Sequence, residues 1–458
     1  MLEQDVLRFS WQCQPQAREL VHRYVHECIE KSSFLKWLEK KLLETASVHL
    51  FDLVDHVEIG YSDELDRELM QTGFTSELVT PFYRVFCHSG AQLPRLVMRD
   101  QPHPLLHIGL IVESIADFLL THGIHAPIEG SPLSAFRRAL VTQGNGVLIY
   151  VVERRATSTM EPTYFQEDRL SKMHEAYEKW ATRPRLADDE IAEEAEFRYA
   201  LLCAEEIVSL IGQPLAAAVV LEQERRYWQA KNSAGQIQKN RQDRLGFGWA
   251  NHDHHTFRSS RKHFQQLVKL FEILGFHTRE RFYAGNEAGW GAQVMEHSQT
   301  RLVLFLDVDL APHELEVDFS HHSLPELQKL GTIGLWCALH GESILKSGMH
   351  HLEAQFIFTQ LKEDLHQFGV AMMSPFSDLP YLKQAFTVGE TWQVTPKRIE
   401  SLMKKGQITQ EQADHFLLQG ALGSHLENLE RHDGYKGFNQ KNVSAIIKKT
   451  DPRYKTGA

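Results

Sequence analysis

GFGWANHDHHTFR, residues 246–258, is the first of five stretches that decide the fold of this chain. It has the texture of a strand, and HFQQLVKLFEILGF at 263–276 has apolar residues at helical spacing. RERFYAG at 279–285, WGAQVMEH at 290–297 and RLVLFLDVDL at 301–310 are short runs separated by turn residues, as strands are. This order predicts a β-α-β-β-β unit.

The same order of elements recurs along the chain. After this unit, a strand-like run at 348–358 precedes a helical segment at 359–369 and strand-like runs at 370–376 and 382–394. Before it, strand-like runs between residues 51 and 154 are interrupted by two segments with helical periodicity. A repeat of this kind predicts two halves, each built from two β-α-β-β-β units.

The remaining segments are rich in helix-forming residues. We therefore expect an α+β fold of tandem modules in two halves, with a helical N-terminus, a central helical insert and helices through residue 458. The expected domains are a helical segment at 1–48, a paired-module domain at 49–155, a helical insert at 156–245 and a second paired-module domain at 246–458.

Composition narrows the class of protein. The 458 residues carry 49 Lys and Arg against 60 Asp and Glu, a net charge of −11, which argues against a nucleic-acid partner. The longest apolar run, 215–221, is far shorter than a membrane span of about 20 residues. No signal-like segment begins the sequence, so we expect a cytoplasmic protein without a membrane partner. The 5 cysteines form no C-x-x-C pair, so a metal site would use histidine and carboxylate ligands.

Histidines on two predicted strands are the strongest candidates for such a site. Strand alternation places His254, Thr256 and Arg258 of the DHHTFR stretch on one face. His351 begins the equivalent strand of the next unit, with Glu353 on its face. If the two strands pair about a pseudo-twofold axis, both imidazoles reach one ion.

Two carboxylates compete to complete the site: Glu427 in HLENLER and Glu390 in TVGETWQV. Two imidazoles and one carboxylate leave coordination positions open, which suits iron(II) with a chelating substrate and O₂. Arg258 has the charge and geometry to hold a substrate carboxylate.

A parallel set occurs in the first half. His56, His107 and Glu153 each lie on a predicted strand, whereas Gly60 stands where the arginine would be. We interpret this set as a degenerate or structural copy.

The second half resembles the 2-oxoadipate dioxygenase/decarboxylase family of the vicinal oxygen chelate superfamily. DHHTFR is similar to the family's D-H-x-x-F-R-T start, and HLENLER, GYKGFNQ and AIIKKTD are similar to its C-terminal motifs. The resemblance covers about residues 250–452. It implies metal ligands His254, His351 and Glu427, and substrate contacts from Arg258 and Arg431.

The resemblance also implies an activity. The expected enzyme uses Fe(II) and O₂ to convert a small-molecule 2-oxo acid such as 2-oxoadipate into a 2-hydroxy acid and CO₂. His350, Glu353 and His425 depart from the family motifs. Two alternatives stay open: a metal-dependent isomerase, lyase or hydrolase that needs no O₂, and a non-catalytic binding scaffold. A homodimer is the oligomeric state to test.

Overall fold

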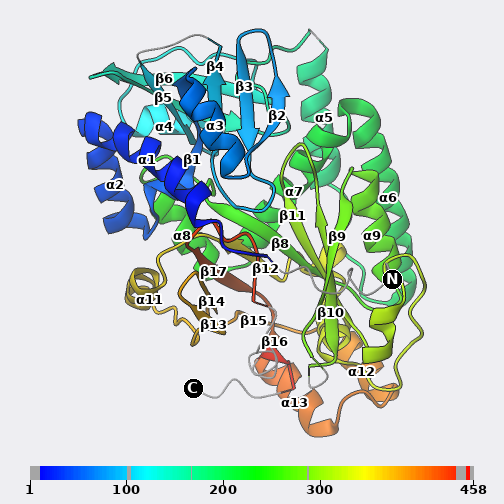
Figure 1. Ribbon diagram of the computed structural model, residues 1–458. Helices are drawn as coiled ribbons and strands as arrows, with labels where there is room; N and C mark the ends of the chain where they lie inside the picture. The colour runs from blue at the N-terminus through cyan, green and yellow to red at the C-terminus, as the bar shows by residue number, and fades with distance from the viewer. Residues whose placement is uncertain (1–10, 101–104, 167, 286–287, 440–449, 454–458) are drawn as a thin grey trace.

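The computed structural model describes residues 11–100, 105–166, 168–285, 288–439 and 450–453. The expected α+β architecture of tandem modules is confirmed: two curled mixed sheets are covered and connected by helices. In Figure 1 the first sheet, blue to cyan, lies above the second, green to red, with α5, α6 and α9 along one side. Most of the AIIKKTD motif lies outside the described residues.

The first sheet has seven strands in the order β2-β3-β4-β1-β5-β7-β6. Its two units meet where β1 pairs antiparallel with β5, and each of these strands pairs in parallel with the last strand of its own unit. The second unit has two strands after its helix, so the prediction of three is wrong here. The elements are β1 (Val54–Gly60), α3 (Asp63–Gln71), β2 (Thr75–Val79), β3 (Tyr83–Cys87), β4 (Arg95–Arg99), β5 (Leu106–Ile111), α4 (Ile115–Thr121), β6 (Phe136–Gly144) and β7 (Val147–Arg154).

The second sheet has eight strands in the order β13-β14-β17-β12-β8-β11-β10-β9. Its units meet where β8 and β12 pair antiparallel, and β11 and β17 pair in parallel with them on either side. The elements are β8 (His252–Arg258), α9 (Phe264–Ile273), β9 (His277–Tyr283), β10 (Trp290–Glu296), β11 (Val303–Asp309), β12 (His351–Ala354), α11 (Phe358–Gln367), β13 (Ser377–Leu379), β14 (Leu382–Phe386) and β17 (His425–Arg431).

A helical excursion separates the last two strands of this sheet. It contains β15 (Thr391–Trp392), α12 (Pro396–Lys404), α13 (Gln410–Gln419) and β16 (Ala421–Leu422). The expectation of helices through the C-terminus is therefore wrong for β17. Its two leucines, Leu426 and Leu429, are three residues apart, which is helical spacing. Both are nevertheless fully buried, because β17 is covered on both faces and shows no alternation.

The remaining helices connect the sheets. They are α1 (Pro15–Lys31), α2 (Ser33–Ala46), α5 (Arg169–Ala181), α6 (Glu190–Ile211), α7 (Gln213–Gln229), α8 (Ser233–Asp243) and α10 (Thr332–His340). Asp189 caps α6 by accepting the backbone N–H of Ala192, and Gly212 ends it with a φ of 81° before Pro214 starts α7. Helix α6 packs on α9, and α8 packs on α2 and β17. One hydrophobic core consequently runs through both halves and the insert. Among the described residues, no helix combines the length and apolarity needed to cross a bilayer.

Candidate metal centre

The three central strands of the second sheet bring its ionisable side chains together. Strand β12 lies between β8 and β17. Its His351 is opposite Thr256 of β8, and its Glu353 is opposite Glu427 of β17. Residues more than 170 positions apart in the sequence thus share one face of the sheet.

The side chains of this face converge on a single point. Nε2 of His254 lies 2.9 Å and Nε2 of His351 lies 2.7 Å from the same atom, Oε1 of Glu353. Oε2 of Glu427 is 3.5 Å from Nε2 of His351. The hydroxyl of Thr256 donates to the same Glu353 oxygen over 2.8 Å. The structure therefore brings His254, His351 and Glu427 together around the Glu353 carboxylate.

Neighbouring groups set the orientation of these side chains. Asp253 lies 2.7 Å from Nδ1 of His254, which leaves Nε2 of this ring as the free donor atom. Asp253 also pairs with Arg431. Gln384 donates to Glu427 over 3.0 Å, and its own carbonyl oxygen accepts the backbone N–H of Asn439.

The charges of the cluster are suited to a cation that would replace its protons. Burial opposes the imidazolium, but Glu353 and Asp253 raise the pKa of His254 to about 10. Burial and the Glu353 charge raise the pKa of Glu427 well above its usual range. Protons thus neutralise a buried site of two imidazoles and two carboxylates, and a divalent ion bound by the same atoms would replace them. The residues present fit such an ion.

Arg258 faces the same cavity with an unsatisfied guanidinium. The residue is 3% exposed, and its Nε and Nη1 have no hydrogen-bond partner within the described part of the chain. Its Nε lies 3.9 Å from Asp307, and its guanidinium carbon lies 5.5 Å from the centre of the Trp336 ring. Burial raises the pKa of Asp307 to about 7 despite Arg258, so this carboxylate compensates the cation only partly.

Aromatic rings form most of the remaining cavity wall. They come from β9, β10, β11, β14 and the segments that flank β13 and follow β17. The rings belong to Phe282, Trp290, Phe305, Phe376, Phe386 and Phe438. A water-poor, apolar surround strengthens the electrostatic interactions of the polar groups that it encloses.

Two residues predicted by sequence lie elsewhere. Glu390 accepts hydrogen bonds from the backbone and hydroxyl of Ser233 and does not line the cavity, so it is not the alternative carboxylate. Arg431 binds Asp253, the neighbour of His254, and donates to the carbonyl of Gly437. A direct contact between Arg431 and substrate stays a prediction.

Glu353 is the residue that sequence reasoning missed. Alternation had placed it on the face of His351, but it was assigned no role. Its position two residues after a candidate ligand on a central strand was the available signal.

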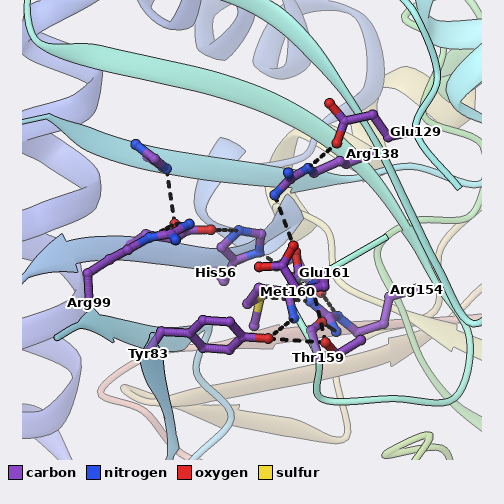
Figure 2. A network of polar contacts seen from close by, with 12 residues as sticks. His56, Tyr83, Arg99, Glu129, Arg138, Arg154, Thr159, Met160 and Glu161 are labelled. Atoms are coloured by element: carbon purple, nitrogen blue, oxygen red, sulfur yellow. Dashed lines mark hydrogen bonds and ion pairs between the residues drawn. The ribbon is translucent and has the colours of Figure 1, made fainter. Parts of the chain in front are cut away.

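The first half repeats the two imidazoles, with Glu58 as the one carboxylate near both of them and no glutamate at the positions of Glu353 and Glu427. His107 is opposite Glu58, as His351 is opposite Thr256. At the position where Glu353 pairs with Glu427 in the second half, the first half has Gly109 paired with Tyr150. Glu58 lies 3.0 Å from Nδ1 of His107 and is held by Arg99. Figure 2 shows His56 between Arg99 and Arg154 in this half.

The register explains why Glu153 does not join this set. It accepts the backbone N–H of Ile115 at the start of α4 and pairs with Arg137 and Arg155. Its counterpart is Glu430, which accepts the N–H of Phe358 at the start of α11. Glu153 therefore points to the opposite face of its strand from the two imidazoles, and the interpretation of His56, His107 and Glu153 as a degenerate or structural copy stays a prediction.

Both halves share one further device. The pairing of β1 with β5 and of β8 with β12 is shifted by one residue at an Asp-His pair, Asp55-His56 and Asp253-His254. In both, an arginine of the last strand binds the aspartate: Arg154 and Arg431. Such bulges redirect side chains next to functional sites.

Comparisons with known proteins reveal only distant likenesses. No family model and no curated protein matches the sequence. Solved structures similar to this chain include a hydrolase-like protein from Shewanella frigidimarina, at 15% identity over 56% of this chain and 99% of that one, with a TM-score of 0.29. A mutant 4-hydroxymandelate synthase from Streptomyces coelicolor has 10% identity over 87% and 98%, with a TM-score of 0.29. Methylmalonyl-CoA epimerase from Mycobacterium tuberculosis has 11% identity over 40% and 89%, with a TM-score of 0.23.

A further similar structure, from Vibrio splendidus, is described as a member of the glyoxalase/bleomycin resistance protein/dioxygenase superfamily, at 12% identity over 21% of this chain and 94% of that one, with a TM-score of 0.17. At such TM-scores the likeness carries no argument about activity, which has to rest on the site itself.

Proposed function

We propose that this protein is a non-haem iron(II)-dependent dioxygenase/decarboxylase that acts on a 2-oxo acid such as 2-oxoadipate. One observation carries the proposal: in one aromatic cavity, two imidazoles and a carboxylate converge beside a buried arginine, two nitrogens of which have no hydrogen-bond partner among the described residues. The ligand set is typical of oxygen-activating iron(II) sites, and the arginine suits a carboxylate substrate.

Each residue has a distinct part in this proposal. His254, His351 and Glu427 would hold the ion, and iron(II) would supply the redox chemistry that couples O₂ reduction to oxidation of the oxo acid. Arg258 would bind the substrate carboxylate through two parallel hydrogen bonds. The reaction balances as oxo acid plus O₂ giving CO₂ and a hydroxy acid one carbon shorter.

The surrounding residues keep this arrangement in place. Asp253, held by Arg431, fixes the ring of His254, and Gln384 fixes Glu427. The aromatic wall excludes water from the substrate.

Glu353 supports a second candidate function. Glu353 lies against both imidazoles, so it could bind the ion as a fourth ligand, which would leave fewer coordination positions for substrate and O₂. Alternatively, its carboxylate could take a proton from a bound substrate. Both roles suit an isomerase or lyase that uses a divalent ion as a Lewis acid and needs no O₂.

An anaerobic preparation separates the two functions. The protein is loaded with Fe(II), its iron content is measured, and O₂ uptake and CO₂ release are followed with 2-oxo acids of four to seven carbons. Uptake that depends on the oxo acid and disappears in His254→Ala supports the proposal. Turnover without O₂ supports the isomerase or lyase, and fully loaded protein that consumes no O₂ with any of these acids contradicts the dioxygenase.

A further inference from the structure

A second cluster of ligand-type side chains lies behind the first. Glu193 of α6, His263 before α9 and Glu342 after α10 each place one ligand atom within 4.8 Å of the other two. The three residues are 8%, 1% and 2% exposed. They come from the helical insert and from two separate segments of the second half.

The imidazole of this cluster is held in place through one ring nitrogen, while the other ring nitrogen lacks a hydrogen-bond partner in the described structure. Nδ1 of His263 lies 2.7 Å from the amide oxygen of Gln266 and so carries the proton. Its Nε2 is buried without a hydrogen-bond partner among the described residues. Phe197, one turn after Glu193 on α6, stacks on the ring with centroids 4.9 Å apart. The ring is therefore fixed, and its Nε2 is available to a further partner.

The carboxylates are also fixed from outside the cluster. Glu342 accepts the backbone N–H of Ser260 at 3.1 and 3.2 Å. One oxygen of Glu193 accepts from Arg398 over 2.8 Å, which leaves its other oxygen for another partner. One imidazole and two carboxylates thus lie close to one another in the interior, and Arg398 pairs with one of the carboxylates.

Buried carboxylates that lie close to one another are costly unless positive charge compensates them. We infer that Glu193, His263 and Glu342 form a second, structural site for a first-row divalent transition-metal ion such as Zn²⁺. An imidazole nitrogen with two carboxylate oxygens is a donor set that such ions accept, with water as a fourth ligand, whereas Mg²⁺ prefers oxygen alone.

The cluster is linked through the backbone to Arg258 of the first site. Ser343, next to Glu342, accepts the backbone N–H of Arg258 over 2.8 Å, and Ser260 lies two residues beyond Arg258. An ion here would tie α6 to the end of β8 and so fix the backbone that presents Arg258 to the cavity.

Metal stoichiometry tests the inference. The full chain is stripped with chelator, reloaded with Zn²⁺, dialysed, and its zinc is counted per chain in the wild type, His254→Ala, His263→Phe and the double variant. We expect two zinc ions per chain in the wild type, one in each single variant and none in the double variant. Phenylalanine keeps the stacking on Phe197 but has no ligand atom. Glu205→Gln, a change of an exposed glutamate on the same helix α6, is the matched control and should keep two zinc ions per chain.

The outcomes separate the two sites. Equal zinc in the wild type and His263→Phe overturns this inference, whereas equal zinc in the wild type and His254→Ala overturns the first site alone. If His263→Phe fails to fold, Glu342→Gln replaces it. In either case, X-ray absorption of zinc in His254→Ala must show one nitrogen among oxygen ligands, and an all-oxygen shell contradicts the assignment.

Discussion

Single side chains decide what this site can hold, and Arg258 is the clearest case. In the part of the chain that the structure describes, two nitrogens of its buried guanidinium have no hydrogen-bond partner, and a carboxylate whose pKa is raised lies near them. A substrate carboxylate would satisfy these donors, so Arg258→Met should raise KM about 10- to 100-fold, as expected for a lost hydrogen bond to a charged group of about 1.5–3 kcal/mol.

Iron content should stay unchanged in this variant, since Arg258 is not a ligand. Arg281→Met, which removes a partly exposed arginine of β9, is the control. Loss of iron from Arg258→Met, measured by mass spectrometry, would show that its role was misassigned.

Asp253 offers a second test at this scale. It fixes the His254 ring, so Asp253→Asn should weaken metal binding about 10- to 100-fold. Asp55→Asn removes the equivalent buried carboxylate of the first half and should leave metal affinity at the second half unchanged. Metal titration of both variants checks this prediction. Equal losses of metal affinity in the two variants would mean that affinity follows the stability of the whole fold and not the orientation of His254.

Sequence reasoning reached the residues of the central strands because alternation is a strict rule. It placed His254, Thr256 and Arg258 on one face and expected His351 to face them. It left the place of Glu153 open, because the register of β7 depends on tertiary pairing that spacing does not encode.

At the scale of elements, the loop between β5 and α4 is tied to the insert by one carboxylate. Glu113 pairs with Arg225 at 3.5 Å and Lys239 at 3.2 Å and accepts the N–H of Trp249. Burial opposes the charge, but Arg225 and Lys239 lower the pKa of Glu113 to about 2. The folded-state pKa lies below the unfolded one, so this stabilisation is complete above pH 4.5 and is lost as pH falls through 2.

Glu113→Gln should therefore reduce the free energy of unfolding on the order of 2 kcal/mol at pH 7. The difference from wild type should shrink as pH falls from 5 towards 2. Denaturant unfolding across this range measures it, with exposed Glu205→Gln as the control. A difference that is constant with pH would assign the effect to packing.

Element prediction succeeded where turn residues separate short apolar runs and failed where the leucines of a buried strand stand at helical spacing. The helix α9 and strands β9 to β11 follow their expected order. Strand β17 carries leucines at helical spacing and is covered on both faces, so only its pairing with β12 and β14 identifies it.

For the whole molecule, the shared hydrophobic core predicts cooperative unfolding. The core is continuous from Ala17 to Leu426, and α8 contacts both α2 and β17. Neither half should melt by itself, because each would expose apolar surface that the insert covers. Calorimetry, circular dichroism and tryptophan fluorescence should report one coincident transition, and two separate transitions would contradict the shared core.

The repeat also limits how this protein can change. In the first half, a Cβ added to Gly109 would lie 2.3 Å from the imidazole of His56. A glutamate cannot enter there until that ring moves, and the ring is anchored by Asp55 and Arg154. Steric exclusion thus closes position 109 of the first half to a glutamate. A substitution there would be accommodated only together with a change that moves His56.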